Sequence, residues 1–369
     1  MQTALDKKKR VPYYEQCASV VLKAIADGQY AVGEFLPSER ELSRRFEVSR
    51  LTLRKGLADL VRKGVLESVP GAGNRVVMKP GGAPRSRLIG CVMNRQAGVR
   101  TLSPYYAEVF GGIEAGLTDA GYSLVFSSVK SGDLWASAGA VRIKPAAVIA
   151  GCAGVLLIGG LPDELANLYR KKGVAVVLVD RVGPQNISCV HPDNHAGALE
   201  LARYLVGLGH RRIAFLGAPG DPVVEARLGG LKKALGEVGG TFQAKDFIRG
   251  DYEIQPAHEA MKAYLVRNRQ RLPTAVMAVN DEAAIGALRA LQESGLRVPA
   301  EISIAGFDDI AWASHTVPPL TTVRIPREEM GRAAARAVVA QLEGGPVAPA
   351  ETVLHTALVV RASCAPPRR

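Results

Sequence analysis

Short runs rich in valine, isoleucine and leucine alternate with segments of helical periodicity between residues 88 and 305. Strand and helix alternating at this spacing require crossover connections, which build parallel, doubly wound sheets. Residues 88–369 are too many for one open sheet, so we expect an α/β fold of two lobes. The expected strands are 88–93, 123–127, 154–158, 175–179, 212–216, 275–279 and 302–305, and the expected helices are 105–120, 163–172, 195–208, 224–238, 257–266 and 282–294.

The first 78 residues do not show this alternating pattern, and a stretch that contains proline and glycine separates them from it. Residues 79–87 hold two prolines and two glycines, which indicates a linker. We therefore expect a small domain at 1–78 and a two-lobed domain at 88–369. The lobes are expected at about 88–193 with 324–346, and at about 194–317 with 351–363.

Local signals predict three helices in the small domain. Residues 13–26 carry an apolar stripe at helical spacing. Ser38 and Glu41 have the spacing of a capping box, in which the serine accepts a hydrogen bond from the Glu41 amide and the glutamate reaches back. A short helix follows this box, and Ser49 can cap a third helix that ends near residue 62.

The third helix would present arginines on one face. Arg50 and Arg54 are i, i+4 neighbours, and Arg50 falls in the first turn. A recognition helix enters the major groove with its N-terminal residues, where arginine can pair bidentately with guanine. The runs 65–69 and 74–78 then flank a glycine-rich turn, which predicts the wing of a winged helix. Two arginines on the surface of a helix are usually exposed to solvent without any function. The DNA-binding prediction therefore depends on the order of these elements rather than on the arginines alone.

Positive charge is concentrated in the same segment. Residues 1–80 hold 15 of the 47 lysines and arginines but only 9 of the 35 acidic residues. This excess indicates an anionic partner, with nucleic acid as the first candidate and a solvated basic face as the alternative. Aromatic residues make up 5% of the chain, which argues against a stacking platform for single strands.

The segments Leu36-Pro-Ser-Glu-Arg-Glu-Leu42 and Val48-Ser-Arg-Leu-Thr-Leu-Arg54 resemble the GntR-family winged helix-turn-helix, over residues 13–78. The resemblance implies double-stranded operator DNA as a partner. The wing Gly71-Ala-Gly-Asn-Arg-Val76 departs from the usual Gly-x-Gly-Thr-Phe-Val, and Arg75 is a candidate to compensate by reaching a phosphate. The implied DNA-binding residues are Arg40, Ser49, Arg50, Thr52, Arg54, Gly73 and Asn74.

Polar residues stand near the ends of the predicted strands in the larger domain. Asp180, Asn280 and Asp308 follow strands, Asp193 precedes a helix, and Arg227 lies near the start of another helix. Acceptors and a guanidinium gathered at one edge suit a polyhydroxylated ligand held between two lobes. Each Asp or Asn taken alone is more simply a helix N-cap, and this alternative stays open.

The same segments resemble the LacI-type regulators, whose core is a periplasmic-binding-protein fold, over about residues 88–363. The resemblance rests on Leu178-Val-Asp-Arg181, Pro192-Asp-Asn194, Val279-Asn-Asp281, Gly306-Phe-Asp-Asp309 and Pro318-Pro-Leu-Thr-Thr-Val323, among others. It implies that Asp180, Arg227, Asn280 and Asp308 hydrogen-bond an effector, with Asp193 near the first crossing between the lobes. Tyr105 and Tyr106 could stack on a sugar ring, although plain packing is equally open.

Two departures from this family indicate an effector unlike that of its best-known members. Ile325 stands where family members often have a glutamine that contacts the ligand. The segment 129–153 is rich in alanine and contains Trp135, which could reach the ligand or merely pack.

A winged helix joined to a LacI-type core resembles a chimeric GntR/LacI regulator. The resemblance implies a homodimer whose operator affinity is controlled by a sugar or sugar derivative, acting as a repressor or alternatively as an activator. The first residues lack an apolar signal core, and the five cysteines are far apart, so we expect a cytoplasmic protein with reduced thiols and no membrane partner. No cofactor and no metal are expected.

An enzyme and a ligand carrier are the rival classes. The chain has no Gly-Lys dipeptide, no GxGxxG and no GxSxG, and the pair Asp308-Asp309 has no accompanying nucleophile. His191, Asp193 and His195 could bind a metal, but Pro192 disfavours a helix that would bring the histidines together. The DNA-binding head argues against a carrier, and we expect a protein that is not an enzyme.

Overall fold

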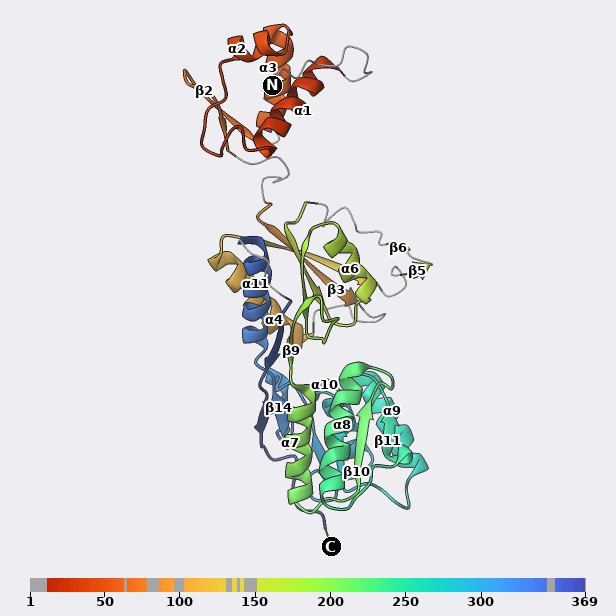
Figure 1. Ribbon diagram of the computed structural model, residues 1–369. Helices are drawn as coiled ribbons and strands as arrows, with labels where there is room; N and C mark the ends of the chain where they lie inside the picture. Colours follow the sequence, from red (N-terminus) through yellow and green to blue (C-terminus); the bar gives the residue numbers. More distant parts are fainter. Residues whose placement is uncertain are drawn as a thin grey trace. The chain divides into compact units, whose positions relative to one another are not determined.

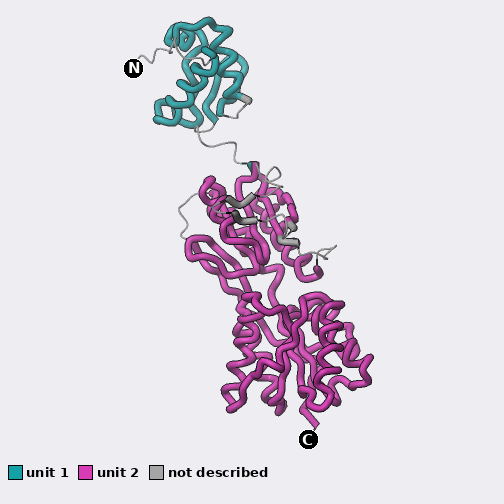
Figure 2. The backbone as a smooth tube through the Cα atoms, turned by 90° about the vertical axis from the view of Figure 1, so that its right-hand side faces the viewer, with its two compact units in different colours: residues 1–87 teal, residues 88–369 magenta. Residues whose placement is uncertain are grey.

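The computed structural model describes residues 12–62, 65–77, 86–95, 103–130, 135–137, 140–142, 151–343 and 349–368 (Figure 1). The chain divides into two compact units, residues 1–87 and 88–369 (Figure 2). Most of the expected linker, residues 79–85, lies outside the described residues. No helix in the described part of the chain is both long and apolar enough to cross a lipid bilayer.

The described residues of unit 1 form three helices and an antiparallel hairpin, as predicted. The helices are α1 (Tyr13–Ala26), α2 (Glu39–Arg45) and α3 (Arg50–Arg62), and the strands are β1 (Leu66–Val69) and β2 (Gly73–Val76). Their apolar faces meet in one core, which includes Cys17, Val21, Ile25, Leu36, Leu42, Leu53, Leu57, Leu60 and Val76. The packing of α1 against α3 therefore fixes the face that α3 leaves to solvent.

The start of α2 is capped by Ser38 as the sequence predicts, but only one of the two hydrogen bonds of the expected capping box forms. The Ser38 hydroxyl accepts a hydrogen bond from the Glu41 amide at 3.3 Å. Within the described residues the Glu41 carboxylate makes no return bond to Ser38. Glu47 in the turn between α2 and α3 has a left-handed backbone with φ of 53°, a strained conformation for a side chain of this length.

The first lobe of unit 2 is built on a parallel sheet. Its strands are β3 (Leu88–Arg95), β4 (Ser123–Lys130), β7 (Gly154–Ile158), β8 (Ala175–Val179), β9 (Ser188–Pro192) and β15 (Glu351–Leu354), in the order β15-β9-β8-β7-β3-β4. Helices α4 (Pro104–Asp119) and α11 (Arg327–Glu343) cover one face, and α6 (Asp163–Lys171) covers the other. Because the inner strands are buried on both faces, they read as continuous apolar runs.

The second lobe has a parallel sheet of four strands. These are β10 (Ile213–Gly217), β11 (Phe247–Arg249), β12 (Ala275–Ala278) and β13 (Ser303–Ala305), in the order β11-β10-β12-β13. Helix α7 (Asn194–Gly207) packs on α8 (Pro222–Glu237), and α9 (Ile254–Arg267) packs on α10 (Asp281–Glu293). Two parallel sheets with covering helices confirm the predicted two-lobed, doubly wound α/β fold.

Four further strands, in two antiparallel pairs, lie in the described part of the second unit. Strands β14 (Thr322–Arg324) and β16 (Ala357–Val359) pair antiparallel beside the second lobe. A separate hairpin joins β5 (Trp135–Ser137) to β6 (Ala140–Arg142). The side chain of Trp135 lies outside the described residues, so its expected role stays a prediction.

The chain passes between the lobes three times: after β9, between β14 and α11, and between β15 and β16. The expectation that 351–363 belongs whole to the second lobe is wrong. Residues Glu351–Leu354 pair with β9 in the sheet of the first lobe, and Glu351 lies opposite Cys189. Three of the four residues of β15 are exposed, which leaves no apolar run that would signal a strand.

Candidate functional site

The N-terminal end of α3 is organised by its own hydroxyl groups. The Ser49 hydroxyl accepts a hydrogen bond from the Thr52 amide at 3.1 Å and lies 2.8 Å from the Thr52 hydroxyl. This is the helix cap that the sequence predicts. Arg50 follows the cap directly and is exposed, so its guanidinium can reach out from the first turn of the helix.

The arginines of unit 1 differ in their partners. Arg54 donates to the Glu39 carboxylate from Nε at 3.2 Å and from Nη2 at 3.0 Å. Arg40 and Arg50 are exposed and form no ion pair with any described residue. Uncompensated guanidinium groups are the ones that phosphate and guanine edges can recruit without breaking an existing contact.

In the wing, Arg75 has a partner of its own, and its contact with a phosphate stays a prediction. Its guanidinium pairs across the hairpin with the Glu67 carboxylate, at 2.5 Å from Nη2 and 3.2 Å from Nε. The charge proposed to reach a phosphate is therefore already balanced. Gly73 turns the hairpin with φ of 107°, and Asn74 is half-buried next to it.

Leu51 is a surface residue of α3 that the sequence analysis did not single out. It is 78% exposed between Arg50 and Thr52. A leucine so exposed gains nothing from the core, and apolar contacts to the thymine methyl group are a common form of base readout. The sequence signal that could have identified Leu51 is its position directly after Arg50, in the first turn of the expected recognition helix.

In unit 2 the structure gathers two tyrosines of the first lobe on one carboxylate. The Tyr105 hydroxyl donates to Asp180 Oδ1 at 2.8 Å, and the Tyr106 hydroxyl donates to Asp180 Oδ2 at 3.1 Å. Both tyrosines lie in the first turn of α4, and Asp180 follows β8 with φ of 62°. The edge of the first sheet thus presents two hydroxyls and a carboxylate together.

Arg227 of α8 organises the facing edge of the second lobe. Its guanidinium donates to Asn194 Oδ1 at 2.9 Å, to Asp308 Oδ1 at 3.4 Å, and to the carbonyl oxygen of Val279. It also lies over the Phe307 ring, 3.8 Å from the centroid. Asp308 itself has a left-handed backbone with φ of 109°.

Electrostatic coupling links the groups of the two lobes. Burial raises the pKa of Asp180, while the Tyr105 hydrogen bond and the Arg227 charge act to lower it. Burial also raises the pKa of Asp308 well above its usual range, and Arg227 opposes this shift. The pKa of Tyr105 is raised by burial and then by Asp180 and Asp308. One cluster therefore contains Tyr105, Tyr106, Asp180, Arg227 and Asp308, which we call the inter-lobe cluster.

Two predicted site residues act as helix caps. Asp193 Oδ1 accepts from the Ala196 amide at 2.8 Å at the start of α7. Asn280 Oδ1 accepts from the Ala283 amide at 2.9 Å at the start of α10. In both residues a side-chain oxygen therefore serves as an N-cap, which agrees with the simpler interpretation. A role in ligand binding stays a prediction.

Tyr252 is a neighbour of the inter-lobe cluster that sequence reasoning missed. Its pKa is raised by burial and by Asp221, lowered by Arg227, and raised by Asp180. Its buried hydroxyl makes no hydrogen bond of standard geometry with a described residue, although Asp221 lies near enough to act on it. Buried polar groups are normally paired, so a ligand or a small shift of Asp221 would supply the partner of this hydroxyl.

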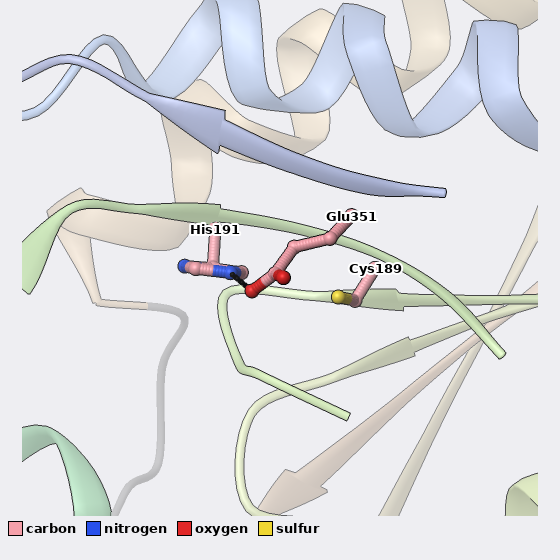
Figure 3. Close-up of side chains that lie close together, drawn as sticks. All are labelled: Cys189, His191 and Glu351. Carbon is pink, nitrogen blue, oxygen red and sulfur yellow. Dashed lines mark hydrogen bonds and ion pairs between the residues drawn. The ribbon is translucent and has the colours of Figure 1, made fainter. Parts of the chain in front are cut away.

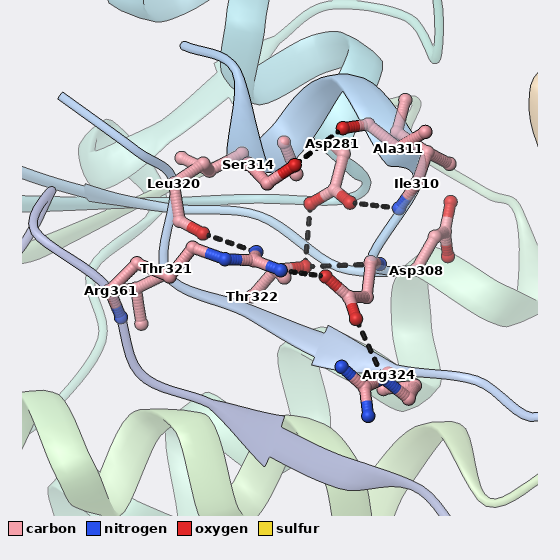
Figure 4. Close-up of polar contacts among 12 residues, drawn as sticks. Asp281, Asp308, Ile310, Ala311, Ser314, Leu320, Thr321, Thr322, Arg324 and Arg361 are labelled. Carbon is pink, nitrogen blue, oxygen red and sulfur yellow. Dashed lines mark hydrogen bonds and ion pairs between the residues drawn. The ribbon is translucent and has the colours of Figure 1, made fainter. Parts of the chain in front are cut away.

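A second network supports the loop that carries Asp308. Asp281 accepts from the Thr322 hydroxyl at 2.6 Å and from the Ile310 amide at 2.9 Å (Figure 4). The adjacent Asp309 is held by Arg361 at 2.5 Å and by Arg324 at 2.7 Å. These bonds fix the residues that directly follow Asp308 in the loop.

Direct contacts also join the lobes beside the cluster. Arg327 of α11 pairs with Glu108 at 2.8 Å and donates to the carbonyl oxygens of Asp308 and Asp309. The Ser103 hydroxyl donates to Glu282 Oε1 at 2.6 Å. The residues of the inter-lobe cluster therefore lie next to the side chains that bond one lobe to the other, so a movement of the cluster would reach those contacts.

The metal-site alternative of the sequence analysis does not assemble as written. Asp193 caps α7, and His191 Nε2 lies 2.8 Å from Glu351 Oε1, a residue far away in the sequence. His191 instead belongs to a cluster with Cys189 and Glu351 (Figure 3).

Comparison with known proteins agrees with both units. Residues 13–76 match the gntR family of bacterial regulatory proteins, and residues 202–364 match the periplasmic binding protein-like domain. The arabinose metabolism transcriptional repressor of Geobacillus stearothermophilus is 29% identical over 358 residues, covering 91% of this chain and 93% of that protein. The regulator CelR of Thermobifida fusca is 33% identical over 267 residues, covering 70% and 76%.

Solved structures show the same fold. A CelR–cellobiose complex superposes with a TM-score of 0.67 at 27% identity and covers 89% of this chain and all of that one. A LacI family regulator from Enterococcus faecium with bound ribose has a TM-score of 0.65 at 23% identity, covering 76% of this chain and all of that one, and supports the fold alone. These relatives are regulators of transcription, and none is named as an enzyme. The chain therefore belongs to the LacI-type regulators with a periplasmic binding protein-like domain, here joined to a GntR-family winged helix-turn-helix, and it is a DNA-binding transcriptional regulator.

Proposed function

We propose that a sugar or sugar derivative binds at the inter-lobe cluster and lowers the affinity of this regulator for its operator, so that the protein acts as a cytoplasmic repressor. The observation that carries the proposal is the pair of tyrosine hydroxyls held on Asp180 in one lobe, electrostatically coupled to Arg227 and Asp308 of the other. Sugar hydroxyls need donors and acceptors in such a mixture. One similar protein is a repressor of arabinose metabolism and another was solved in complex with cellobiose, which favours a saccharide.

The proposed response is a shift between arrangements of the two lobes. A ligand that bridges Asp180 and Asp308 binds one arrangement better than the other and so changes its population. Arg327 and Glu282 pass the change on, because they bond across the lobe boundary next to these residues. A coupling of about 1–3 kcal/mol, or roughly 5–150-fold in operator affinity, is typical of such systems.

The DNA-binding half of the proposal uses the exposed end of α3 and the wing. Arg40 and Arg50 offer uncompensated charge, and Ser49, Thr52 and Arg54 lie beside them. Gly73 and Asn74 begin β2 directly after the hairpin turn. We propose that a homodimer presents two copies of this surface to two operator half-sites, because two-fold symmetric regulators read operators in this way.

The test is a thermal-shift screen of the purified protein against pentoses, hexoses, disaccharides and nucleosides. A ligand that binds the folded protein raises its melting temperature by mass action. Operator binding is then measured with and without each hit. The variants Tyr106→Phe and Asp308→Asn should lose the shift and the response to the hit while binding operator normally, whereas Tyr204→Phe, outside the cluster, should keep both. An unchanged response in both cluster variants would contradict the proposed site.

A further inference from the structure

Three side chains with metal-binding atoms converge where the two lobes are connected. Cys189 and His191 are two residues apart on β9, so they lie on the same face of the sheet. Glu351 lies opposite Cys189 in the parallel pairing of β15 with β9. The sulfur, the ring nitrogens and the carboxylate oxygens offer ligand atoms within 4.8 Å of one another (Figure 3).

The hydrogen bonding of His191 leaves one contact unexplained. One ring nitrogen, Nδ1, lies 3.1 Å from the carbonyl oxygen of Pro192, and the other, Nε2, lies 2.8 Å from Glu351 Oε1. Both partners are acceptors, whereas a neutral imidazole has a single N–H to donate. If Nδ1 donates to Pro192, the lone pair of Nε2 faces a carboxylate oxygen. A positive centre between these two atoms, either a second ring proton or a metal ion, removes that repulsion.

We propose that Cys189, His191 and Glu351 bind one Zn²⁺ ion, with a fourth position left to water or another ligand, although the sequence spacing predicted no metal. Thiolate, imidazole and carboxylate are the donor types that zinc takes in proteins. Zinc–ligand bonds of about 2.0–2.3 Å in a tetrahedron hold the ligand atoms about 3.3–3.8 Å apart. The three ligand atoms now lie within 4.8 Å of one another, so zinc binding requires them to close to this spacing.

The surroundings orient the imidazole, and a bound cation would be what stabilises the thiolate. Burial raises the pKa of the Cys189 thiol; the Gly183 amide and the Arg181 charge act to lower it, and the Glu351 carboxylate acts to raise it, so a metal ion is needed to displace the thiol proton. The contact from His191 Nδ1 to the Pro192 carbonyl orients the ring with Nε2 toward Glu351. Such a second bond is the usual way in which a metal-binding histidine is oriented.

The position of the site gives it a regulatory consequence, which rests on the proposed function. β9 and β15 are the two strands from which the chain leaves the first lobe for the second. An ion bound to both strands adds a further link between two of the three connections, beside the ladder hydrogen bonds that pair β9 with β15. Zinc should therefore change how strongly the effector alters operator affinity, without contacting the effector.

The first experiment measures metal binding by itself. Metal-free, reduced protein is titrated with Co²⁺, which reports a thiolate ligand through a sulfur-to-cobalt charge-transfer band, and Zn²⁺ is then added to displace it. We expect one equivalent of Co²⁺, the charge-transfer band and full displacement by zinc. Absence of the band in the wild-type protein would overturn the proposal and leave His191 and Glu351 as an ion pair.

Matched variants assign the ligands. Cys189→Ser and Glu351→Gln should weaken zinc binding by at least about tenfold, since even the loss of an outer partner of a metal ligand costs roughly 10–100-fold. Glu351 is largely exposed, so Glu351→Gln tests the site without risk to the fold. Cys152→Ser and Glu164→Gln, in the same lobe, should bind zinc as the wild type does. Equal affinity in all variants would refute the assignment, whereas a failure of sugar or operator binding alone would leave it standing.

Discussion

The arginines around the recognition helix differ in what their charge already contacts. Arg54 and Arg75 are paired with Glu39 and Glu67, whereas Arg40 and Arg50 are not paired with any described residue. An exposed ion pair is worth about 0–1 kcal/mol, so Arg54 can exchange its partner for a phosphate at small cost. An unpaired arginine needs no exchange. The strongest dependence of operator binding should therefore fall on the unpaired residues.

Arg50→Ala should weaken operator binding by about 1–3 kcal/mol and relax the preference for one base, provided that Arg50 pairs with a guanine. The measurement is a binding titration against the operator and against operators with single base changes. Arg75→Ala is the matched control, and it should cost less because Glu67 already balances that charge. Equal losses for both variants would mean that the wing contributes as much to operator binding as the first turn of α3.

At the scale of elements, helices α4 and α11 approach each other through glycines. A Cβ atom at Gly112 would collide with the carbonyl oxygen of Glu328, and one at Gly331 would collide with that of Val109. The two helices share the cover of one face of the first sheet, and α11 carries Arg327 toward the second lobe. Close packing at this crossing therefore also sets the position of an inter-lobe contact.

Gly112→Ala should destabilise unit 2 by about 1–3 kcal/mol, because the added methyl group must push two backbones apart. The neighbouring Gly111 gives the control, since a Cβ there meets no atom within 4 Å. Gly111→Ala should be neutral or stabilising by up to about 1 kcal/mol, as expected for an exposed helical position. Urea unfolding of the two variants checks the difference. If the two alanine variants were equally stable, the helices would not be closely packed at this point.

The same elements show what sequence can predict. β7 and β8 are predicted to the residue, because strands buried on both faces are short, continuous apolar runs. β15 is missed, because three of its four residues are exposed and its pairing with β9 depends on the whole fold. The sequence predicts Asp180, Arg227 and Asp308 as individual candidates through their places at strand and helix ends. It does not bring Glu351 to His191, which lies 160 residues away, nor does it reveal the buried hydroxyl of Tyr252.

At the scale of the whole molecule, the second unit contains several buried aspartate side chains near the boundary between its lobes. Burial raises the pKa values of Asp180, Asp281 and Asp308, and that of Asp281 reaches about 7. Asp309 differs: burial acts to raise its pKa, but hydrogen bonds from Arg361 and Arg324 lower it overall. An acid whose pKa is raised by folding keeps its proton in the folded state after the unfolded chain has lost it. The free energy of unfolding therefore falls as pH rises through this interval.

Asp281→Asn should remove part of this pH dependence. The unfolded aspartate ionises near pH 4 and the folded one near 7, so the wild type loses stability relative to the variant between these values. Asparagine keeps one acceptor oxygen but places an N–H donor where the second oxygen accepted a hydrogen bond, so we expect the variant to be less stable than the wild type at pH 5. Because the wild type loses stability as pH rises, this deficit should shrink toward pH 8. Both tryptophans lie in residues 88–369, so fluorescence during urea unfolding reports this unit. A deficit that stays constant from pH 5 to pH 8 would show that Asp281 does not titrate in this range.

The place of β15 at the end of the chain sets an order in protein synthesis. The four strands of the second sheet are contiguous in the sequence, so the ribosome delivers them together. The first sheet is begun earlier but waits for Arg327–Glu343 to cover one face and for Glu351–Leu354 to complete its edge. Until then an apolar face and an unpaired strand are open to chaperones and to aggregation. The lobe that is translated first is thus the last to be finished, and a nascent chain that stops before residue 351 carries a complete second sheet on an unfinished first one.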